Sequence, residues 1–172
     1  MNLIVAVDRE WGIGNKGDLL ARVRGDLRNF ASLTSGRVVI CGSKTLKTFP
    51  DGKPLKNRVN IVLSRDPGLK IEGAQVAHSP GEVLLLTEKY DGGDVFVIGG
   101  AQIYRLLLPY CDCCYVTKFE KSFEKDAFFT DLDASPEWAL AYRGPLLRSC
   151  EETDTEKNMD YYFTKYRRIK NG

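Results

Sequence analysis

Residues 95–104 read VFVIGGAQIY: four apolar residues, two glycines and the beginning of a longer segment. A short run of Val and Ile such as Val95–Ile98 is typical of a strand that is buried on both faces of a sheet. The following segment, Ala101–Leu108, has a helical pattern, and Pro109 marks its end. Because a strand that leads directly into a helix is the building unit of parallel sheets, this stretch predicts an α/β fold.

The same alternation extends along the chain in both directions. Four more apolar runs predict strands, at Leu3–Val7, Val38–Cys41, Arg58–Leu63 and Tyr115–Phe119. No helical pattern separates the last two expected strands, Trp138–Arg143 and Tyr161–Tyr166, which is typical of an antiparallel edge. The sequence therefore predicts one α/β domain over residues 1–172: a central, mostly parallel, twisted sheet flanked by helices, with an antiparallel C-terminal edge.

Two more helices are expected between these strands. The first has a stripe at three- and four-residue spacing that contains Leu27, Phe30, Ala31 and Thr34. The second begins after Ser79, because a serine N-cap with proline in the first turn and Glu82 three residues later forms a capping pattern.

Composition excludes several classes of function. The 172 residues are 43% hydrophobic, which suits one domain with a real core. The 25 Lys and Arg residues against 23 Asp and Glu leave a net charge of only +2, so the charge balance gives no reason to expect nucleic acid. The basic segment Tyr166–Lys170 is interpreted as a solvated chain end.

The N-terminus and the cysteines indicate a cytoplasmic protein. The apolar run from Leu3 has neither a basic segment before it nor a cleavage pattern after it, so we expect no signal peptide and no membrane anchor. Five cysteines without a secretory signal fit a reducing compartment. Cys111 and Cys114 form a C-x-x-C pair, but Cys113 lies within it and His78 is the single histidine, so we expect no metal site.

Two glycine-rich segments resemble nucleotide-binding motifs, but one lacks the structural context of its motif and the other lacks required residues. Residues 12–17, GIGNKG, fit G-x-G-x-x-G, but Asp8–Trp11 separate them from the strand and the next helix begins only at about Gly25. We interpret this segment as a mobile loop. Residues 42–45, GSKT, lack the preceding glycine and the Gly-Lys pair of a phosphate loop.

Two strand-to-helix turns nevertheless have the right form to hold phosphates. At Gly42–Thr45 and at Gly99–Gly100 the backbone N–H groups can face a phosphate that approaches closely over glycine. Glycine at one such turn is explained equally well by tight packing. Two such turns in one chain make a dinucleotide plausible.

Asp26 lies in the first turn of the first helix, where it admits two interpretations. A carboxylate at this position stabilises the helix dipole, which explains most first-turn aspartates. Alternatively, it faces an apolar cleft beside Leu27 and Phe30 and acts on a substrate. The residues alone leave both interpretations open.

Taken in order, these segments resemble the dihydrofolate reductase family over almost the whole chain. The segments that resemble the family are LIVAVDREWGIGNKGDLL at 3–20, DLRNF at 26–30, VVICGSKT at 38–45, KPLKNRVNIVLSR at 53–65, VFVIGGAQIY at 95–104 and YVTKF at 115–119. The resemblance implies an oxidoreductase of one-carbon metabolism that reduces 7,8-dihydrofolate to 5,6,7,8-tetrahydrofolate with NADPH. Hydride would go to C6 of the pterin and a proton from water to N5, as the loop Gly12–Leu20 opens and closes.

The resemblance also implies the residues of the substrate site. Asp26 would be the active-site acid that binds the pterin N–H and amino group, and Thr117 would orient it. Arg58 would bind the glutamate α-carboxylate as a bidentate fork. The residues expected to contact the substrate are Val5, Ala6, Leu27, Phe30, Phe49, Leu55 and Arg58. Antifolates are expected to bind this site, and we expect a monomer.

A second set would bind NADPH. Ile13 and Leu19 would cover the nicotinamide, Lys44 and Arg65 would face the phosphates, and Asp126 would hold the closed loop. The complete expected set is Ala6, Ile13, Gly14, Leu19, Gly42, Ser43, Lys44, Thr45, Leu63, Ser64, Arg65, His78, Ile98, Gly99, Gly100, Ala101, Gln102 and Tyr104.

The chain departs from the family pattern at three places. Leu20-Ala21 replaces Pro-Trp, Arg24-Gly25 replaces a pair that contains proline, and Ser43 replaces an arginine that meets the cofactor's 2′-phosphate. Two other interpretations remain open. One is a related pyrimidine reductase of riboflavin synthesis, which would lack the pattern of Asp26, Phe30 and Arg58. The other is a non-catalytic binding protein that retains the fold.

Overall fold

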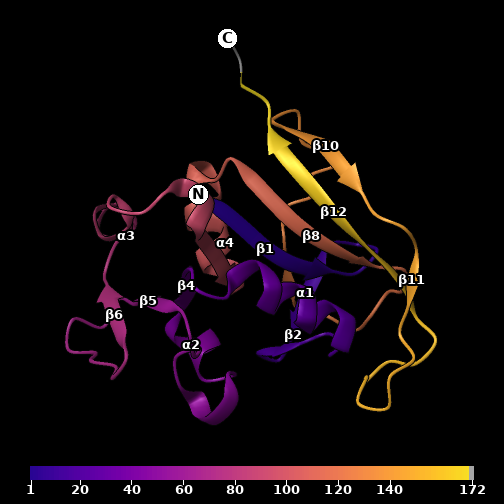
Figure 1. Cartoon of the computed structure of the whole chain (residues 1–172), viewed down its shortest axis with the longest axis horizontal. Helices are drawn as coiled ribbons and strands as arrows, with labels where there is room; N and C mark the ends of the chain where they lie inside the picture. Colours follow the sequence, from indigo (N-terminus) through magenta and orange to yellow (C-terminus); the bar gives the residue numbers. More distant parts are fainter. Residues whose placement is uncertain (171–172) are drawn as a thin grey trace.

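The computed structural model describes residues 1–170 and contains one large sheet with helices on both faces (Figure 1). Within these residues nine strands form the large sheet, in the order β10-β12-β8-β1-β7-β4-β5-β6, with β11 paired to β12. The strands are β1 (Asn2–Val7), β4 (Val38–Gly42), β5 (Val59–Leu63), β6 (Ala74–Ala77), β7 (Val95–Gly99), β8 (Cys113–Phe119), β10 (Trp138–Arg143), β11 (Leu147–Arg148) and β12 (Asp160–Arg168).

Six neighbouring strands of the sheet run parallel, in the order β8-β1-β7-β4-β5-β6. By contrast, β12 is antiparallel to β8, and β10 is antiparallel to β12. The predicted fold is therefore confirmed, including its antiparallel C-terminal edge. The helices are α1 (Arg24–Thr34), α2 (Ser43–Leu46), α3 (Pro80–Thr87) and α4 (Ala101–Leu107), with 3₁₀ turns at Pro50–Gly52, Gly92–Asp94 and Leu108–Tyr110. None of these helices is long and apolar enough to cross a membrane.

Alternate residues of the central strands build two cores. On one face Leu3 and Val97 pack with Leu107 of α4, and on the other Ile4 and Phe96 pack with Phe30 of α1. Because both faces are covered, these strands consist of continuous apolar runs.

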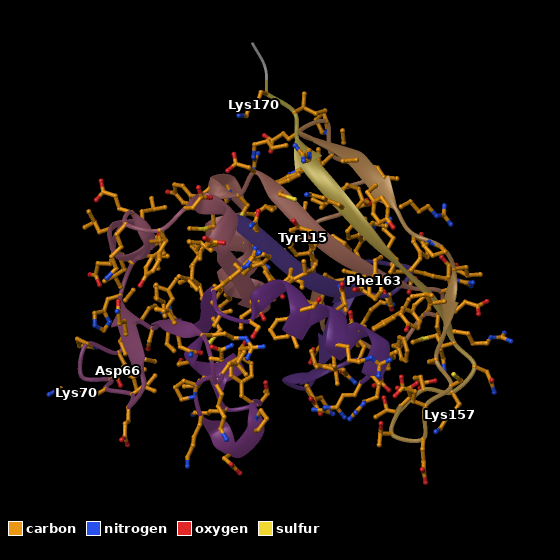
Figure 2. All side chains as sticks on the ribbon, in the orientation of Figure 1. Asp66, Lys70, Tyr115, Lys157, Phe163 and Lys170 are labelled. Atoms are coloured by element: carbon orange, nitrogen blue, oxygen red, sulfur yellow. The ribbon has the colours of Figure 1, made fainter. Side chains whose placement is uncertain are left out.

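The connections before β6 and before β12 lie at opposite ends of the molecule, where Figure 2 labels Lys70 and Lys157.

Two local predictions are wrong. The glycine-rich segment is not all loop: β2 (Gly12–Asn15) and β3 (Asp18–Leu19) form a hairpin, and β2 also pairs with β9 (Ala127–Phe128). A partner distant in sequence orders this segment despite its glycines. The basic C-terminal segment is not simply a solvated end, because β12 extends to Arg168, whose guanidinium donates to the carbonyl oxygens of Cys111 and Leu108.

Candidate functional site

A cavity of about 620 Å³ opens at the carboxyl ends of four parallel strands. Its walls include Ala6 near the end of β1, Gly42 of β4, Leu63 of β5 and Ile98 of β7. Ligands of α/β sheets bind at this edge, where the loops that follow the strands converge. The topology therefore places a ligand-sized space where the sequence predicts a dinucleotide.

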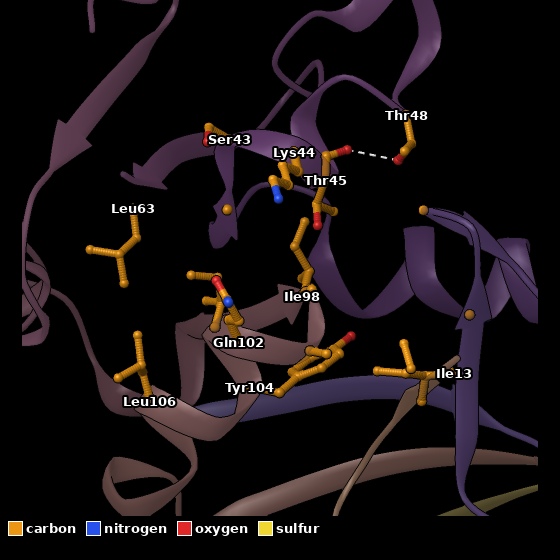
Figure 3. Close-up of a pocket in the computed structure, with 18 of the residues that line it drawn as sticks. Ile13, Ser43, Lys44, Thr45, Thr48, Leu63, Ile98, Gln102, Tyr104 and Leu106 are labelled. Carbon is orange, nitrogen blue, oxygen red and sulfur yellow. Dashed lines mark hydrogen bonds between the residues drawn. The ribbon is translucent and has the colours of Figure 1, made fainter. Parts of the chain in front are cut away.

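The structure brings every residue predicted for NADPH into the lining of this cavity. Figure 3 shows Lys44 and Thr45 of α2 across from Gln102 and Tyr104 of α4, with Ile13 of β2 to one side. Sequence reasoning missed eight further lining residues: Gly17, Asp18, Thr48, Asp66, Pro80, Ile103, Leu106 and Ala127. Most of them are close neighbours in sequence of predicted residues, and that adjacency was the available signal.

The two glycine turns are packed tightly as well as facing the cavity. A Cβ on Gly42 would lie 2.9 Å from Cγ1 of Ile103, and a Cβ on Gly100 would lie 2.9 Å from Oγ1 of Thr45. Gly99 has a φ of 135°, in the region that favours glycine, and the Gly99–Gly100 peptide is cis. Packing therefore requires glycine at these turns, which also line the cavity.

Basic side chains predominate at the end of the cavity formed by α2 and β5. Lys44, Arg65 and His78 line it, with Asp66 beside them. His78 Nδ1 lies 2.9 Å from the carbonyl oxygen of Ser64, which fixes the imidazole against the cavity wall. Three groups that are able to carry positive charge suit the phosphates of a dinucleotide. No three His, Cys, Asp or Glu side chains within residues 1–170 form a possible metal site.

The opposite end of the cavity is mostly apolar, with Asp18 as the charged residue of the hairpin that lines it. Ile13, Gly14 and Leu19 of the β2–β3 hairpin lie there with Tyr104. The Tyr104 hydroxyl donates to the carbonyl oxygen of Ile4 at 2.7 Å, and burial raises the pKa of that hydroxyl. Asp126, predicted to hold the loop, accepts from the Lys16 N–H at 3.0 Å and donates its own N–H to the Gly14 carbonyl oxygen.

Asp26 and Thr117 form a hydrogen-bonded pair one strand away from this cavity. Thr117 Oγ1 donates to Asp26 Oδ1 at 2.6 Å, which links α1 to β8. Burial of the Asp26 carboxyl raises its pKa to about 6, and the hydrogen bond from Thr117 opposes that rise. Neither residue lines the cavity, but Thr117 is the register partner of Ala6, which does. A half-buried acid thus lies next to the cavity's apolar end.

The other residues predicted for the substrate divide into two groups. Val5 and Ala6 line the cavity, whereas Leu27, Phe30, Phe49, Leu55 and Arg58 do not. Phe30, Phe49 and Leu55 pack against the core on the α1 face of the sheet, and Leu27 is 41% exposed. This second group therefore lies outside the cavity, with Phe30, Phe49 and Leu55 on the α1 face of the sheet.

The Arg58 guanidinium is held by two hydrogen bonds and by an aromatic ring. Its Nε donates to Thr34 Oγ1 at 3.0 Å and one terminal nitrogen donates to the Lys56 carbonyl oxygen at 2.7 Å. The guanidinium lies 5.8 Å from the centre of the Phe30 ring, and partial burial lowers its pKa. None of the salt bridges within residues 1–170 involves Arg58. A fixed, partly desolvated cation is thus available for a carboxylate.

The unusual segment before α1 is held by the loop between β11 and β12. Asp154 accepts from the Arg24 N–H at 2.7 Å, which caps α1 in place of its own N-cap residue, Val23. A Cβ on Gly25 would lie 2.0 Å from the Tyr161 hydroxyl. Glycine is required here because Tyr161 occupies the space in which a side chain would lie.

Comparison with known proteins agrees with this geometry. The family model described as dihydrofolate reductase matches residues 1–168. The dihydrofolate reductase of Bacillus subtilis (strain 168) is 38% identical over 167 residues, covering 96% of this chain and 93% of the relative, and that of Staphylococcus haemolyticus is 34% identical over 172 residues, covering 99% and 96%. The solved structure of dihydrofolate reductase from Enterococcus faecalis complexed with NADP(H) and RAB-propyl superposes with a TM-score of 0.81 at 31% identity, covering 98% and 96%.

Proposed function

This chain belongs to the dihydrofolate reductase family, and from that membership we propose which of its residues carry out the reaction. The protein is an oxidoreductase that reduces 7,8-dihydrofolate to 5,6,7,8-tetrahydrofolate with NADPH. The pyrimidine reductase and the non-catalytic protein are not favoured by these similarities. The main support for these residue roles is the hydrogen-bonded pair of Asp26 and Thr117, which lies beside a cavity that suits NADPH.

The residues that line the cavity fit NADPH. Lys44, Arg65 and His78 suit the phosphates, and the glycine turns let the cofactor lie close to the strand ends. Ile13 and Leu19 suit the nicotinamide, because an apolar cover excludes water from the hydride path. When bound, NADPH supplies the hydride that is added to C6 of the pterin.

Asp26 acts on the pterin by charge. With a pKa of about 6 the carboxylate is mostly ionised at neutral pH, so it accepts hydrogen bonds from the ring N–H and the amino group and favours the form protonated at N5. The proton itself comes from water, because the ionised Asp26 carboxylate has no proton to donate at neutral pH. Arg58 binds the glutamate α-carboxylate, and Leu27, Phe30, Phe49 and Leu55 surround the rings.

Three further properties belong to this proposal. Antifolates compete with dihydrofolate at Asp26, the protein acts as a monomer, and it works in the cytoplasm. All five cysteines carry free thiols, which suits a reducing compartment.

The direct test mixes the purified protein with NADPH and dihydrofolate and follows the absorbance of the reduced cofactor. We expect the absorbance to fall with formation of tetrahydrofolate. No oxidation at saturating concentrations of both compounds would contradict the proposed function.

The hydrogen bond from Thr117 should set the pH range in which Asp26 works. Thr117→Val removes a bond that lowers the pKa of Asp26, so that pKa should rise by about one unit, because a hydrogen bond to a charge contributes roughly 1.5–3 kcal/mol. The pH profile of kcat/KM should shift upward. Thr164→Val is the control, since Thr164 bonds the Val116 carbonyl oxygen on the neighbouring strand and should leave the profile unchanged. Equal profiles for both variants would exclude this role of Thr117.

Ser43 should limit the preference for NADPH over NADH. We expect the wild type to prefer NADPH through Lys44 and Arg65, and Ser43→Arg to tighten NADPH binding by about 1 kcal/mol. The dissociation constants of both cofactors can be measured by fluorescence titration. If NADH binding tightens equally, the gain does not come from the 2′-phosphate.

A further inference from the structure

Asp8, in the turn between β1 and β2, is a fully buried carboxylate with four donors. Its Oδ1 accepts from the N–H groups of Gly12 at 2.8 Å and Glu10 at 2.9 Å. Its Oδ2 accepts from the N–H of Phe123 at 3.0 Å and from Nζ of Lys125 at 2.5 Å. Burial favours a high pKa for Asp8, but these hydrogen bonds hold it below its usual value, so the group is an anion that requires its partners.

Lys125 brings the compensating charge from the connection between β8 and β9. Its side chain is only 9% exposed, and its Nζ also bonds Glu10 and the Phe123 carbonyl oxygen. The methylene stem lies across Gly12, where a Cβ would fall 2.0 Å from Cδ of the lysine. The ion pair therefore ties the β1–β2 turn to a segment more than a hundred residues away.

This ion pair adjoins the part of the hairpin that lines the cavity. Gly12 is followed by Ile13 and Gly14, which line the cavity, whereas Asp8 and Lys125 do not line it. The turn also holds Trp11 at a φ of 62°, a conformation that bulky residues rarely adopt, with its N–H bonded to the Asp8 carbonyl oxygen. Such a turn persists only where its surroundings fix it.

We propose that the buried ion pair of Asp8 and Lys125 holds the β2–β3 hairpin against the nicotinamide end of NADPH, which makes both of them positioning residues for hydride transfer. The inference rests on the proposed function for the identity of the cofactor. Without the lysine, an uncompensated carboxylate draws water into the turn, and the hairpin no longer keeps Ile13 and Gly14 in place. Small displacements near a reacting centre cost large factors in rate.

The test compares Lys125→Met, which keeps the apolar stem, with Lys121→Met as a matched control. Lys121 lies in the same connection and pairs with Glu156 at 2.6 Å on the surface. In Lys125→Met we expect NADPH to dissociate about tenfold faster, by stopped-flow fluorescence without dihydrofolate, and the pre-steady-state hydride step to slow about tenfold. Hydrogen exchange in a peptide covering residues 9–20 should accelerate in the cofactor-free protein. Lys121→Met should stay within about twofold of the wild type in all three.

A double variant tests the same role of the ion pair if Lys125→Met does not fold. Asp8→Asn with Lys125→Met removes both charges of the buried pair and leaves only the exposed carboxylate of Glu10 without its lysine partner. This variant should also release NADPH faster than the wild type. A folded variant with wild-type NADPH release and wild-type exchange in residues 9–20, but a lower melting temperature, would overturn the proposal and leave the pair a purely structural role. A wild type that binds NADPH but does not oxidise it with dihydrofolate would count against the proposed function alone.

Discussion

Asp26→Asn should lower kcat/KM for dihydrofolate at neutral pH by about tenfold to a few hundredfold. The substitution keeps the shape of the side chain but removes the charge that binds the pterin, and hydrogen bonds to a charged group contribute roughly 1.5–3 kcal/mol. Steady-state assays at pH 7 measure the effect. Full activity at that pH would remove Asp26 from the site.

The same variant should be more stable than the wild type at neutral pH. The pKa of Asp26 is raised to about 6 in the folded protein, above its unfolded value, so the stability this group contributes is present at about pH 4 and is lost as the pH rises through 6. Asparagine stays neutral, and we expect a gain of about 1–3 kcal/mol at pH 7 that vanishes near pH 4. Urea unfolding at both pH values measures it. A merely dipole-stabilising aspartate predicts the opposite sign, a loss of about 0.3–1 kcal/mol.

Arg58→Lys should weaken dihydrofolate binding by about tenfold to a hundredfold. The guanidinium is oriented by Thr34 and Lys56. Within residues 1–170 its remaining N–H groups have no side-chain partner, so they can bind a bidentate carboxylate, which an ammonium group cannot match. A truncated pterin without the glutamate should bind the variant and the wild type alike. Equilibrium titration with both compounds checks the difference.

Arg37→Lys is a suitable control for this experiment. Arg37 is a half-buried arginine whose guanidinium pairs with Asp94 at 3.6 Å, donates to the Gly93 carbonyl oxygen at 3.1 Å and lies over the Phe96 ring, and it is not one of the predicted substrate residues. Its variant should bind dihydrofolate within about twofold of the wild type. If Arg58→Lys weakens the truncated pterin as much as dihydrofolate, Arg58 does not bind the glutamate.

The sequence predicted the central strands of the sheet because they are short apolar runs that are buried on both faces. It also predicted turns able to face phosphates at Gly42–Thr45 and at Gly99–Gly100, and both turns line the cavity. Residues at the carboxyl ends of parallel strands can therefore be predicted from the sequence.

Features that depend on distant partners could not be predicted. The β2–β3 hairpin has a glycine-rich sequence with little strand propensity, and it is ordered by β9, Asp126 and Asp8. The edge strand β6, with the sequence AQVA, is too short and too weakly patterned to be recognised. The requirement for Gly25 comes from Tyr161, more than a hundred residues later. The raised pKa of Asp26 likewise arises from packing between α1 and β8, which no local pattern encodes.

The central claim is that an ionised Asp26 promotes protonation of the pterin during the reduction of dihydrofolate. The most direct measurement is kcat/KM for dihydrofolate against pH, from about pH 5 to about pH 9, for the wild type and Asp26→Asn side by side. The account predicts that the ratio of wild type to variant is large and constant above pH 7. It should shrink as the pH falls through 6, because Asp26 loses its charge and acid supplies substrate that is already protonated at N5. A ratio that stays constant across the whole range would contradict the account.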